Sequence, residues 1–157
     1  MSEPESVDTP HLLRAIAVSW EARERGNHPF GALLVGPDGQ VLLEAENTVV
    51  TDRDVTGHAE LNLVRAASRD LPAEVVAAST LYASCEPCAM CAGAIFWSGV
   101  GRVVYALGGS TLNRISGDGP ALEHPLRLVL ADGDRAVDVS GPHLEDEAAV
   151  AHRGFWE

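Results

Sequence analysis

The chain has 157 residues, 46% of them hydrophobic, which suits one domain with a sizeable core. Its formal net charge is −12, with 23 acidic and 11 basic residues, and this balance disfavours nucleic acid as the main partner. All three cysteines fall within residues 85–91, so no disulfide framework is available and a cytoplasmic location is expected. We expect no signal peptide and no membrane span, and a single domain over residues 1–157 with a flexible segment at 1–8.

Hydrophobic spacing predicts alternating helices and strands along the chain. Thr9 can cap a first helix that has Pro10 at its first position, and the helical spacing ends at Gly26. The elements expected after it are strands over 30–35 and 41–46, a polar connection over 47–57, a helix behind residues 58–60, a strand over 81–83, a helix that ends near 98, a strand over 100–107, a loop or short helix within 108–123, a helical turn over 126–130, a strand over 136–139 and a helix over 145–152.

The turn sequence and the order of elements predict the topology. Residues 36–39 read Gly-Pro-Asp-Gly, a hairpin signal, so the strands on either side should pair antiparallel. The later strands alternate with helices, which implies that they run parallel with right-handed crossovers. The fold class is therefore expected to be α/β, a three-layer α/β/α sandwich around a five-stranded mixed sheet.

Two short motifs carry the chemistry: His-Ala-Glu at 58–60 and Pro-Cys-Ala-Met-Cys at 87–91. The imidazole of His58 and the thiolates of Cys88 and Cys91 suit Zn²⁺, and three protein ligands leave the open position that a catalytic site needs. The two cysteines are three residues apart at a predicted helix start, so both sulfurs can reach one metal. Pro87 fits the first position of that helix, where the helix dipole also favours thiolates.

Glu60 is the predicted catalytic residue. It lies two residues after His58, so both side chains can occupy the first turn of a helix without lying over one another. His58 can then bind the metal while Glu60 faces whatever the metal holds. A carboxylate beside a zinc-activated water can take a proton and later deliver it to a leaving group, so Glu60 is expected to act as general base and then as general acid.

Two other interpretations of the cysteines stay open at this point. A structural zinc would need a fourth ligand, and the nearest thiol is Cys85, which also suits a small buried residue at a strand end. A redox Cys-x-x-Cys pair is the second alternative, although it leaves His58 and Glu60 without a role.

The motifs match the H-x-E and P-C-x-x-C signature of zinc-dependent cytidine and adenosine deaminases. Over about residues 10–108 the chain resembles the cytidine deaminase-like superfamily. Residues 29–32, 47, 58–60 and 85–97 are similar to the branch that contains bacterial guanine deaminases and tRNA adenosine deaminases. The resemblance implies the sandwich fold, a zinc cofactor and hydrolytic deamination of a nucleobase or nucleoside, such as guanine or cytosine, with release of ammonia.

The resemblance also implies a substrate pocket at the carboxyl ends of the strands. Asn47 matches a position that hydrogen-bonds the substrate ring, with an ordinary turn asparagine as the alternative. The backbone N–H of Ala59 is similar to a further donor. Phe30 and Trp97 would sandwich a planar base, with ordinary core packing as the alternative for both.

The segment 108–157 is expected to cover the pocket, because guanine deaminases of the family close theirs with a C-terminal segment, which is sometimes donated by a partner subunit. Phe155 and Trp156, with Glu145 or Asp146, could close the pocket here. Glu145 and Trp156 are the candidate substrate-binding residues within it. The resemblance and the apolar residues of the cysteine helix also imply a homodimer. The remaining histidines have no partner pattern and are expected at the surface or at helix caps: His11, His28, His124, His143 and His152.

Two rival functions are weighed against a base or nucleoside deaminase. A tRNA-specific adenosine deaminase would need a basic surface and a basic tail, yet residues 136–157 contain one Arg and no Lys. An inactive zinc-binding interaction module is the other alternative, and the intact Glu60 argues against it.

Overall fold

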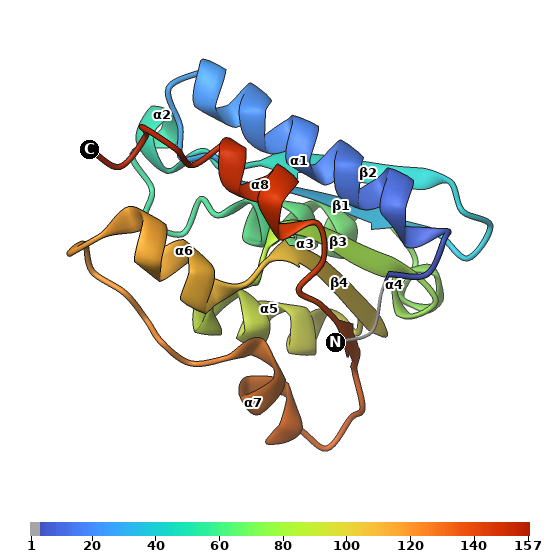
Figure 1. Ribbon diagram of the computed structural model, residues 1–157. Coiled ribbons are helices and arrows are strands. Elements are labelled where there is room, and N and C mark those ends of the chain that lie inside the picture. The colour runs from blue at the N-terminus through green and yellow to red at the C-terminus, as the bar shows by residue number, and fades with distance from the viewer. Residues whose placement is uncertain (1–3) are drawn as a thin grey trace.

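The computed structural model describes residues 4–157, which form one five-stranded mixed sheet with helices on both faces (Figure 1). The predicted three-layer α/β/α sandwich is therefore confirmed. The elements are, in chain order, α1 (Asp8–Glu24), β1 (Gly31–Val35), β2 (Val41–Glu46), α2 (Val49–Asp52), α3 (Ala59–Asp70), α4 (Ala73–Ala77), β3 (Thr80–Cys85), α5 (Ala89–Ser98), β4 (Arg102–Leu107), α6 (Gly109–Ser116), α7 (Leu126–Ala131), β5 (Asp138–Ser140) and α8 (Glu145–Val150).

The strands are arranged in the order β2-β1-β3-β4-β5. β1 pairs antiparallel with β2 and with β3, whereas the β3–β4 and β4–β5 pairs are parallel. β2, β3, β4 and β5 therefore run in one direction, and their carboxyl ends meet at one edge of the sheet. The predicted hairpin and the common direction of the later strands are both confirmed, with β1 inserted between β2 and β3.

The core has two halves, one on each face of the sheet. Every residue of β1 is buried, and successive side chains of a strand point to opposite faces. Leu33 packs with Leu12 of α1 in the half that α1 and α8 cover. Leu34 packs with Leu63 of α3 and Ile95 of α5 in the other half. The sheet thus holds the starts of α3 and α5 in fixed positions on the same face.

The first helix begins at Asp8 instead of at Pro10, and the predicted cap by Thr9 is wrong. Asp8 is fully buried and accepts hydrogen bonds from Arg102 of β4, at 2.8 and 2.9 Å, and from the hydroxyl of Tyr82 of β3, at 2.7 Å. Burial raises the pKa of Asp8, but the bonds from Arg102 and Tyr82 outweigh that effect and the net pKa is lowered. These bonds, absent from any local pattern, fix where the helix starts.

Other boundaries differ from expectation by a few residues. The polar connection contains α2, and α4 was not expected because five residues give too short a hydrophobic pattern. The fourth and fifth strands start two residues later than expected, and the last helix ends at Val150. Of the segment expected to be flexible, residues 1–3 lie outside the described residues. Between residues 4 and 157, no helix combines the length and the apolar composition needed to cross a membrane.

Candidate metal centre and active site

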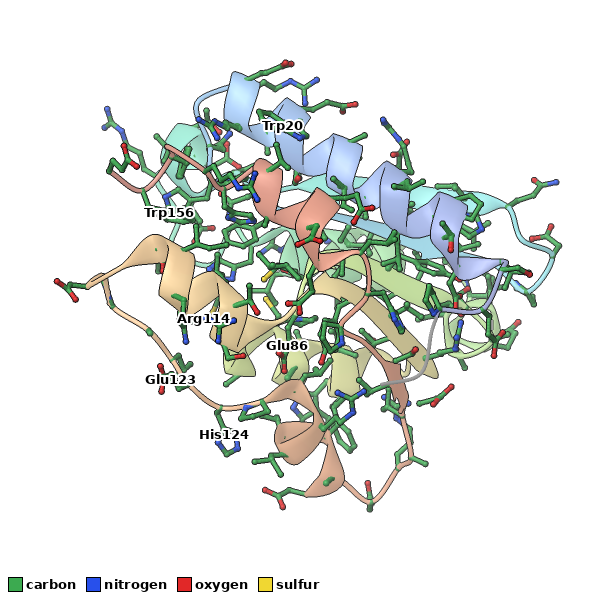
Figure 2. All side chains as sticks on the ribbon, viewed as in Figure 1. Trp20, Glu86, Arg114, Glu123, His124 and Trp156 are labelled. Carbon is green, nitrogen blue, oxygen red and sulfur yellow. The ribbon has the colours of Figure 1, made fainter. Side chains whose placement is uncertain are left out.

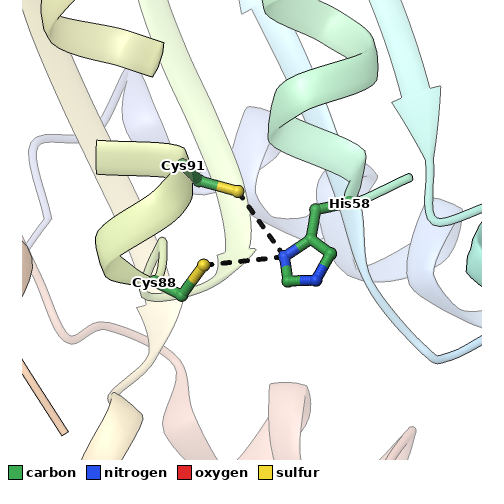
Figure 3. A group of neighbouring side chains, drawn as sticks. All are labelled: His58, Cys88 and Cys91. Atoms are coloured by element: carbon green, nitrogen blue, oxygen red, sulfur yellow. Dashed lines mark hydrogen bonds between the residues drawn. The ribbon is translucent and has the colours of Figure 1, made fainter. Parts of the chain in front are cut away.

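His58 and Glu60 lie at the start of α3, which follows β2 and the short α2. His58 is the N-cap residue, with extended backbone angles (φ −68°, ψ 147°), and Ala59 and Glu60 are the first two helical residues. The imidazole points from the start of α3 toward α5 (Figure 3).

Cys88 and Cys91 lie at the start of α5, which follows β3. Cys88 is the N-cap residue and has an extended backbone, while Cys91 belongs to the first turn. Pro87 therefore precedes the N-cap instead of filling the predicted first helical position. Because β2 and β3 run in the same direction, α3 and α5 begin at the same edge of the sheet and their first residues face each other (Figure 3).

The three predicted metal ligands converge on one point. Nδ1 of His58 lies 3.6 Å from Sγ of Cys88 and 3.6 Å from Sγ of Cys91 (Figure 3), and one ligand atom of each residue lies within 4.8 Å of the others. Tetrahedral zinc with ordinary bond lengths separates its nitrogen and sulfur ligands by about 3.6 Å. One imidazole and two thiols at this spacing therefore fit Zn²⁺, with a fourth coordination position left open.

The structural-zinc alternative lacks its fourth ligand among residues 4–157. Cys85 is the last residue of β3, is 2% exposed and packs in the core half under α1. Burial raises the pKa of its thiol well above the ordinary value. Cys85 is therefore the small buried residue that its position suggested.

The ligand side chains set each other's protonation. The hydrogen bond from the Cys91 thiol, helped by His58, lowers the pKa of Cys88 to about 4. The contact with Cys88 raises the pKa of His58, and donation to Cys88 together with burial raises the pKa of Cys91. A zinc ion needs thiolates and a neutral imidazole, so binding would displace the protons that Cys91 and His58 hold.

Glu60 is buried beside these ligands. Its side chain is 5% exposed, and Oε2 accepts a hydrogen bond from Sγ of Cys91 at 3.5 Å. Burial raises the pKa of Glu60 to about 7, and the negative charge of Cys88 acts in the same direction. A carboxyl group that gains and loses protons near neutral pH is suited to general acid–base chemistry.

Asn47 and Ala59 supply hydrogen-bonding groups near the start of α3. Asn47 follows β2 and is 1% exposed; its Oδ1 accepts from the N–H of Val49 at 3.1 Å, and its own N–H donates to the carbonyl of Phe30. Within residues 4–157, Nδ2 of Asn47 has no hydrogen bond. Ala59 is the first residue of α3, so its N–H is one of those that a helix leaves without an internal partner.

Five rings bring the C-terminal tail against the segment before β1, and we call them the aromatic group: His28, Phe30, His152, Phe155 and Trp156. The ring centroids of Phe30 lie 5.2 Å from His152 and 6.2 Å from Trp156. Burial lowers the pKa of His28, and the charge of His58 lowers it further. Trp156, labelled in Figure 2, also lines a cavity of about 410 Å³, together with residues of the tail and of the end of α6.

Trp97 and Glu145 lie outside the aromatic group. Trp97 is 85% exposed near the end of α5 and packs edge-on against Phe96, so it forms no sandwich with Phe30 in this chain. The reason is the orientation of α5, whose buried face carries the metal ligand and core residues instead. Glu145 begins α8, and its Oε2 accepts from the N–H of Gly108 at 2.9 Å.

The sequence did not predict two features of the tail. The expectation that the remaining histidines lie at the surface or at caps is wrong for His143 and His152, which are 5% and 1% exposed. Arg23 of α1 donates to the carbonyls of Ala151 and Arg153, at 2.8 and 2.9 Å, and so holds the tail on α1. Backbone carbonyls leave no mark in the sequence, so no local pattern could reveal this contact.

Residues 5–107 match the family described as the cytidine and deoxycytidylate deaminase zinc-binding region, and both motifs lie within that match. The chain belongs to this family. The expected superfamily, the hydrolytic deaminase class and the zinc cofactor are thereby confirmed, and the ligand spacing of the structure agrees with them.

Relatives of known name come from the expected branch. A Schizosaccharomyces pombe protein described as a probable cytosine deaminase is 42% identical over 156 residues, which cover 96% of this chain and 93% of that protein. The guanine deaminase of Bacillus subtilis is 43% identical over 96 residues, which cover 60% of this chain and 61% of that protein. The solved structure of a guanine deaminase from Nitrosomonas europaea superposes with a TM-score of 0.72 at 25% identity, over 90% of this chain and 80% of that one.

Proposed function

We propose that this chain is a zinc-dependent hydrolytic deaminase of a free nucleobase, with cytosine as the first candidate substrate and guanine as the second. The observation that carries the proposal is the meeting of His58, Cys88 and Cys91 at zinc-ligand spacing beside the buried carboxyl of Glu60. Similarity to a cytosine deaminase along 96% of the chain includes the tail, whereas the similarity to a guanine deaminase takes in 60%. This difference favours cytosine.

Glu60 carries the protons of the reaction. When bound by the three ligands, zinc would supply the Lewis-acid chemistry that lowers the pKa of a coordinated water to about 7. Glu60 accepts a proton from the attacking water at a carboxylate oxygen as the carbon–oxygen bond forms, and gives it to the adjacent ring nitrogen. It then takes the remaining hydroxyl proton and gives it to the exocyclic nitrogen as the carbon–nitrogen bond breaks, which leaves a carbonyl on the ring. The products are ammonia and the base with a carbonyl in place of its amine. Burial holds the pKa of Glu60 near the value that both transfers require.

The substrate ring is held by two donors and by aromatic walls. Nδ2 of Asn47 and the N–H of Ala59 are free to donate to a ring oxygen or nitrogen. Phe30 and Trp156 offer flat apolar faces, and His28 packs on Trp156. Glu145 contributes to substrate binding indirectly, because its carboxylate accepts a hydrogen bond from Gly108 and so fixes the turn at that residue. The tail thereby closes the pocket from within the same chain.

Trp97 is assigned to a homodimer interface instead of the pocket. Met90 and Trp97 are exposed two helical turns apart on α5, and Gly93 between them leaves open space. An exposed apolar strip of this kind on a small domain suits contact with a second copy. A cytoplasmic location would keep Cys88 and Cys91 reduced for the metal. The charge of −12 disfavours the tRNA alternative.

An ammonia-release panel tests the substrate. The zinc-loaded chain is assayed with cytosine, guanine, adenine, their nucleosides and a tRNA anticodon stem, and release is expected from cytosine first. Glu60→Gln should keep its zinc while turnover falls by about 10² to 10⁴-fold, because the proton carrier is lost and the ligands are not. Cys88→Ala should lose zinc and turnover together.

Cys85→Ala is the matched control, because it removes a thiol from the same loop without removing a ligand. It should keep both zinc and turnover. Activity on tRNA alone, or loss of zinc from Glu60→Gln, would contradict the proposal. Normal zinc binding without ammonia release from any compound would favour the inactive binding module.

A further inference from the structure

Both carboxylate oxygens of Glu86 accept hydrogen bonds from the backbone of other segments. Oε2 accepts from the N–H of Gly109 at 2.9 Å, and Oε1 accepts from the N–H of Leu126 at 3.0 Å. The N–H of Glu86 itself donates to the carbonyl of Leu107 at 2.7 Å. Figure 2 shows Glu86 between α6 and α7. One residue therefore joins the end of β4 and the starts of two helices.

Glu86 acts as the N-terminal cap of both helices. Gly109 and Leu126 are the first residues of α6 and α7, so their N–H groups have no partner inside the helix. The N-cap residues, Gly108 and Pro125, make no side-chain capping bond. A carboxylate at a helix N-terminus also interacts favourably with the helix dipole.

Glu86 belongs to the loop that delivers Cys88 to the metal. It directly follows Cys85, the last residue of β3, and directly precedes Pro87. The far end of α6 borders the cavity that Trp156 lines, and α7 packs on α5, the helix that carries Cys91. The same carboxylate thus connects the cysteine loop with a helix beside the tail and with a helix that packs on the cysteine helix.

We propose that Glu86 is a positioning residue, which holds α6 and α7 against the cysteine loop and thereby sets the affinity for substrate without touching substrate or metal. The effect on substrate affinity rests on the proposed function, whereas the double capping role stands on the contacts alone. Glutamine at this position keeps one acceptor and presents an NH₂ group to the other N–H, so one helix loses its cap. Alanine removes both caps.

The test uses the zinc-loaded full chain and the variants Glu86→Ala and Glu86→Gln. Asp8→Asn is the matched control, because Asp8 is also a carboxyl that joins distant segments, but through α1, β3 and β4. The measurements are amide hydrogen exchange over residues 109–116 and 126–131, zinc content, the visible spectrum of the Co²⁺-substituted protein, and KM and kcat for cytosine.

In Glu86→Ala, exchange at the starts of α6 and α7 should accelerate by about tenfold or more, since each lost bond is to a charged acceptor. KM should rise by about tenfold, with a smaller change in kcat and full zinc content. Glu86→Gln should accelerate exchange in one of the two helices, and it gives the same test where the alanine variant does not fold. Asp8→Asn should lower the midpoint of unfolding while KM and the cobalt spectrum stay unchanged.

Unchanged exchange in both helices of Glu86→Ala would overturn the proposal. A rise in KM of equal size in Asp8→Asn would also overturn it, because the effect would then follow lost stability at any site. If the wild-type chain deaminates no compound of the panel, the proposed function fails, and the exchange and cobalt measurements still decide the role of Glu86.

Discussion

The buried imidazole of His152 predicts a specific loss of stability in mild acid. His152 is 1% exposed, and burial, followed by the charge of Arg23, lowers its pKa to about 4. Its Nδ1 accepts a hydrogen bond from Nε1 of Trp156 at 3.3 Å, and only an unprotonated nitrogen can accept. Protonation would therefore place an unsolvated charge in the aromatic group and break the bond that holds Trp156.

The magnitude follows from the two pKa values of His152. The unfolded chain binds a proton with a pKa of about 6.5, whereas the folded chain binds it only near 4. The stability contributed by the neutral imidazole is therefore fully present above pH 6.5 and is lost as the pH falls from 6.5 toward 4. At 1.36 kcal/mol per unit the total loss is ~3.4 kcal/mol, and the loss between pH 7.5 and pH 5 is ~2 kcal/mol.

The assay is urea unfolding of the zinc-loaded chain between pH 5 and 7.5, compared with His152→Asn. The asparagine Oδ1 takes the place of Nδ1 as acceptor for Trp156 and does not titrate. Burial also lowers the pKa values of His28 and His143, and both proteins lose stability through them equally. Between pH 7.5 and pH 5, the free energy of unfolding of the variant should therefore fall by ~2 kcal/mol less than that of the wild type. Equal losses in the two proteins would refute the reasoning.

Two further predictions concern the metal and the surface of α5. Removal of zinc by a chelator should abolish turnover. Added Zn²⁺ should restore turnover and added Mg²⁺ should not, because two of the three ligands are thiolates. Recovery of turnover with Mg²⁺ would contradict the ligand assignment. Trp97→Glu should shift the chain to monomers in sedimentation velocity without loss of zinc, since Trp97 is 85% exposed; an unchanged dimer would place the interface elsewhere.

The sequence predicted the metal ligands because each motif is local and chemically specific. His58 and Cys88 both turn out to be N-cap residues of helices that follow strands of the same direction. Strand direction can be inferred from the alternation of elements. The sequence therefore also predicts that α3 and α5 begin at the same edge of the sheet. Pro87 was misplaced by two positions, because a proline favours both the first helical residue and the turn before the helix.

The surroundings of the site could not be predicted in the same way. Trp156 reaches Phe30 from the far end of the chain, and the contacts that hold it there come from Arg23 to backbone carbonyls. Glu86 likewise binds backbone N–H groups, which every segment possesses. The exposure of Trp97 in this chain could not be predicted for another reason: α5 is apolar on most sides, so its periodicity does not reveal which face is buried.

The metal site and the tail therefore rest on different parts of this fold. The ligands and Glu60 depend on β2, β3 and the helices that follow them, all within the matched residues 5–107. Of the proposed pocket residues, Phe30, Asn47 and Ala59 lie in the same part of the chain, whereas Trp156 lies in the chain after β4, which Glu86 and Arg23 help to attach to that framework. A change in the tail can thus alter the shape of the pocket while the metal geometry stays intact.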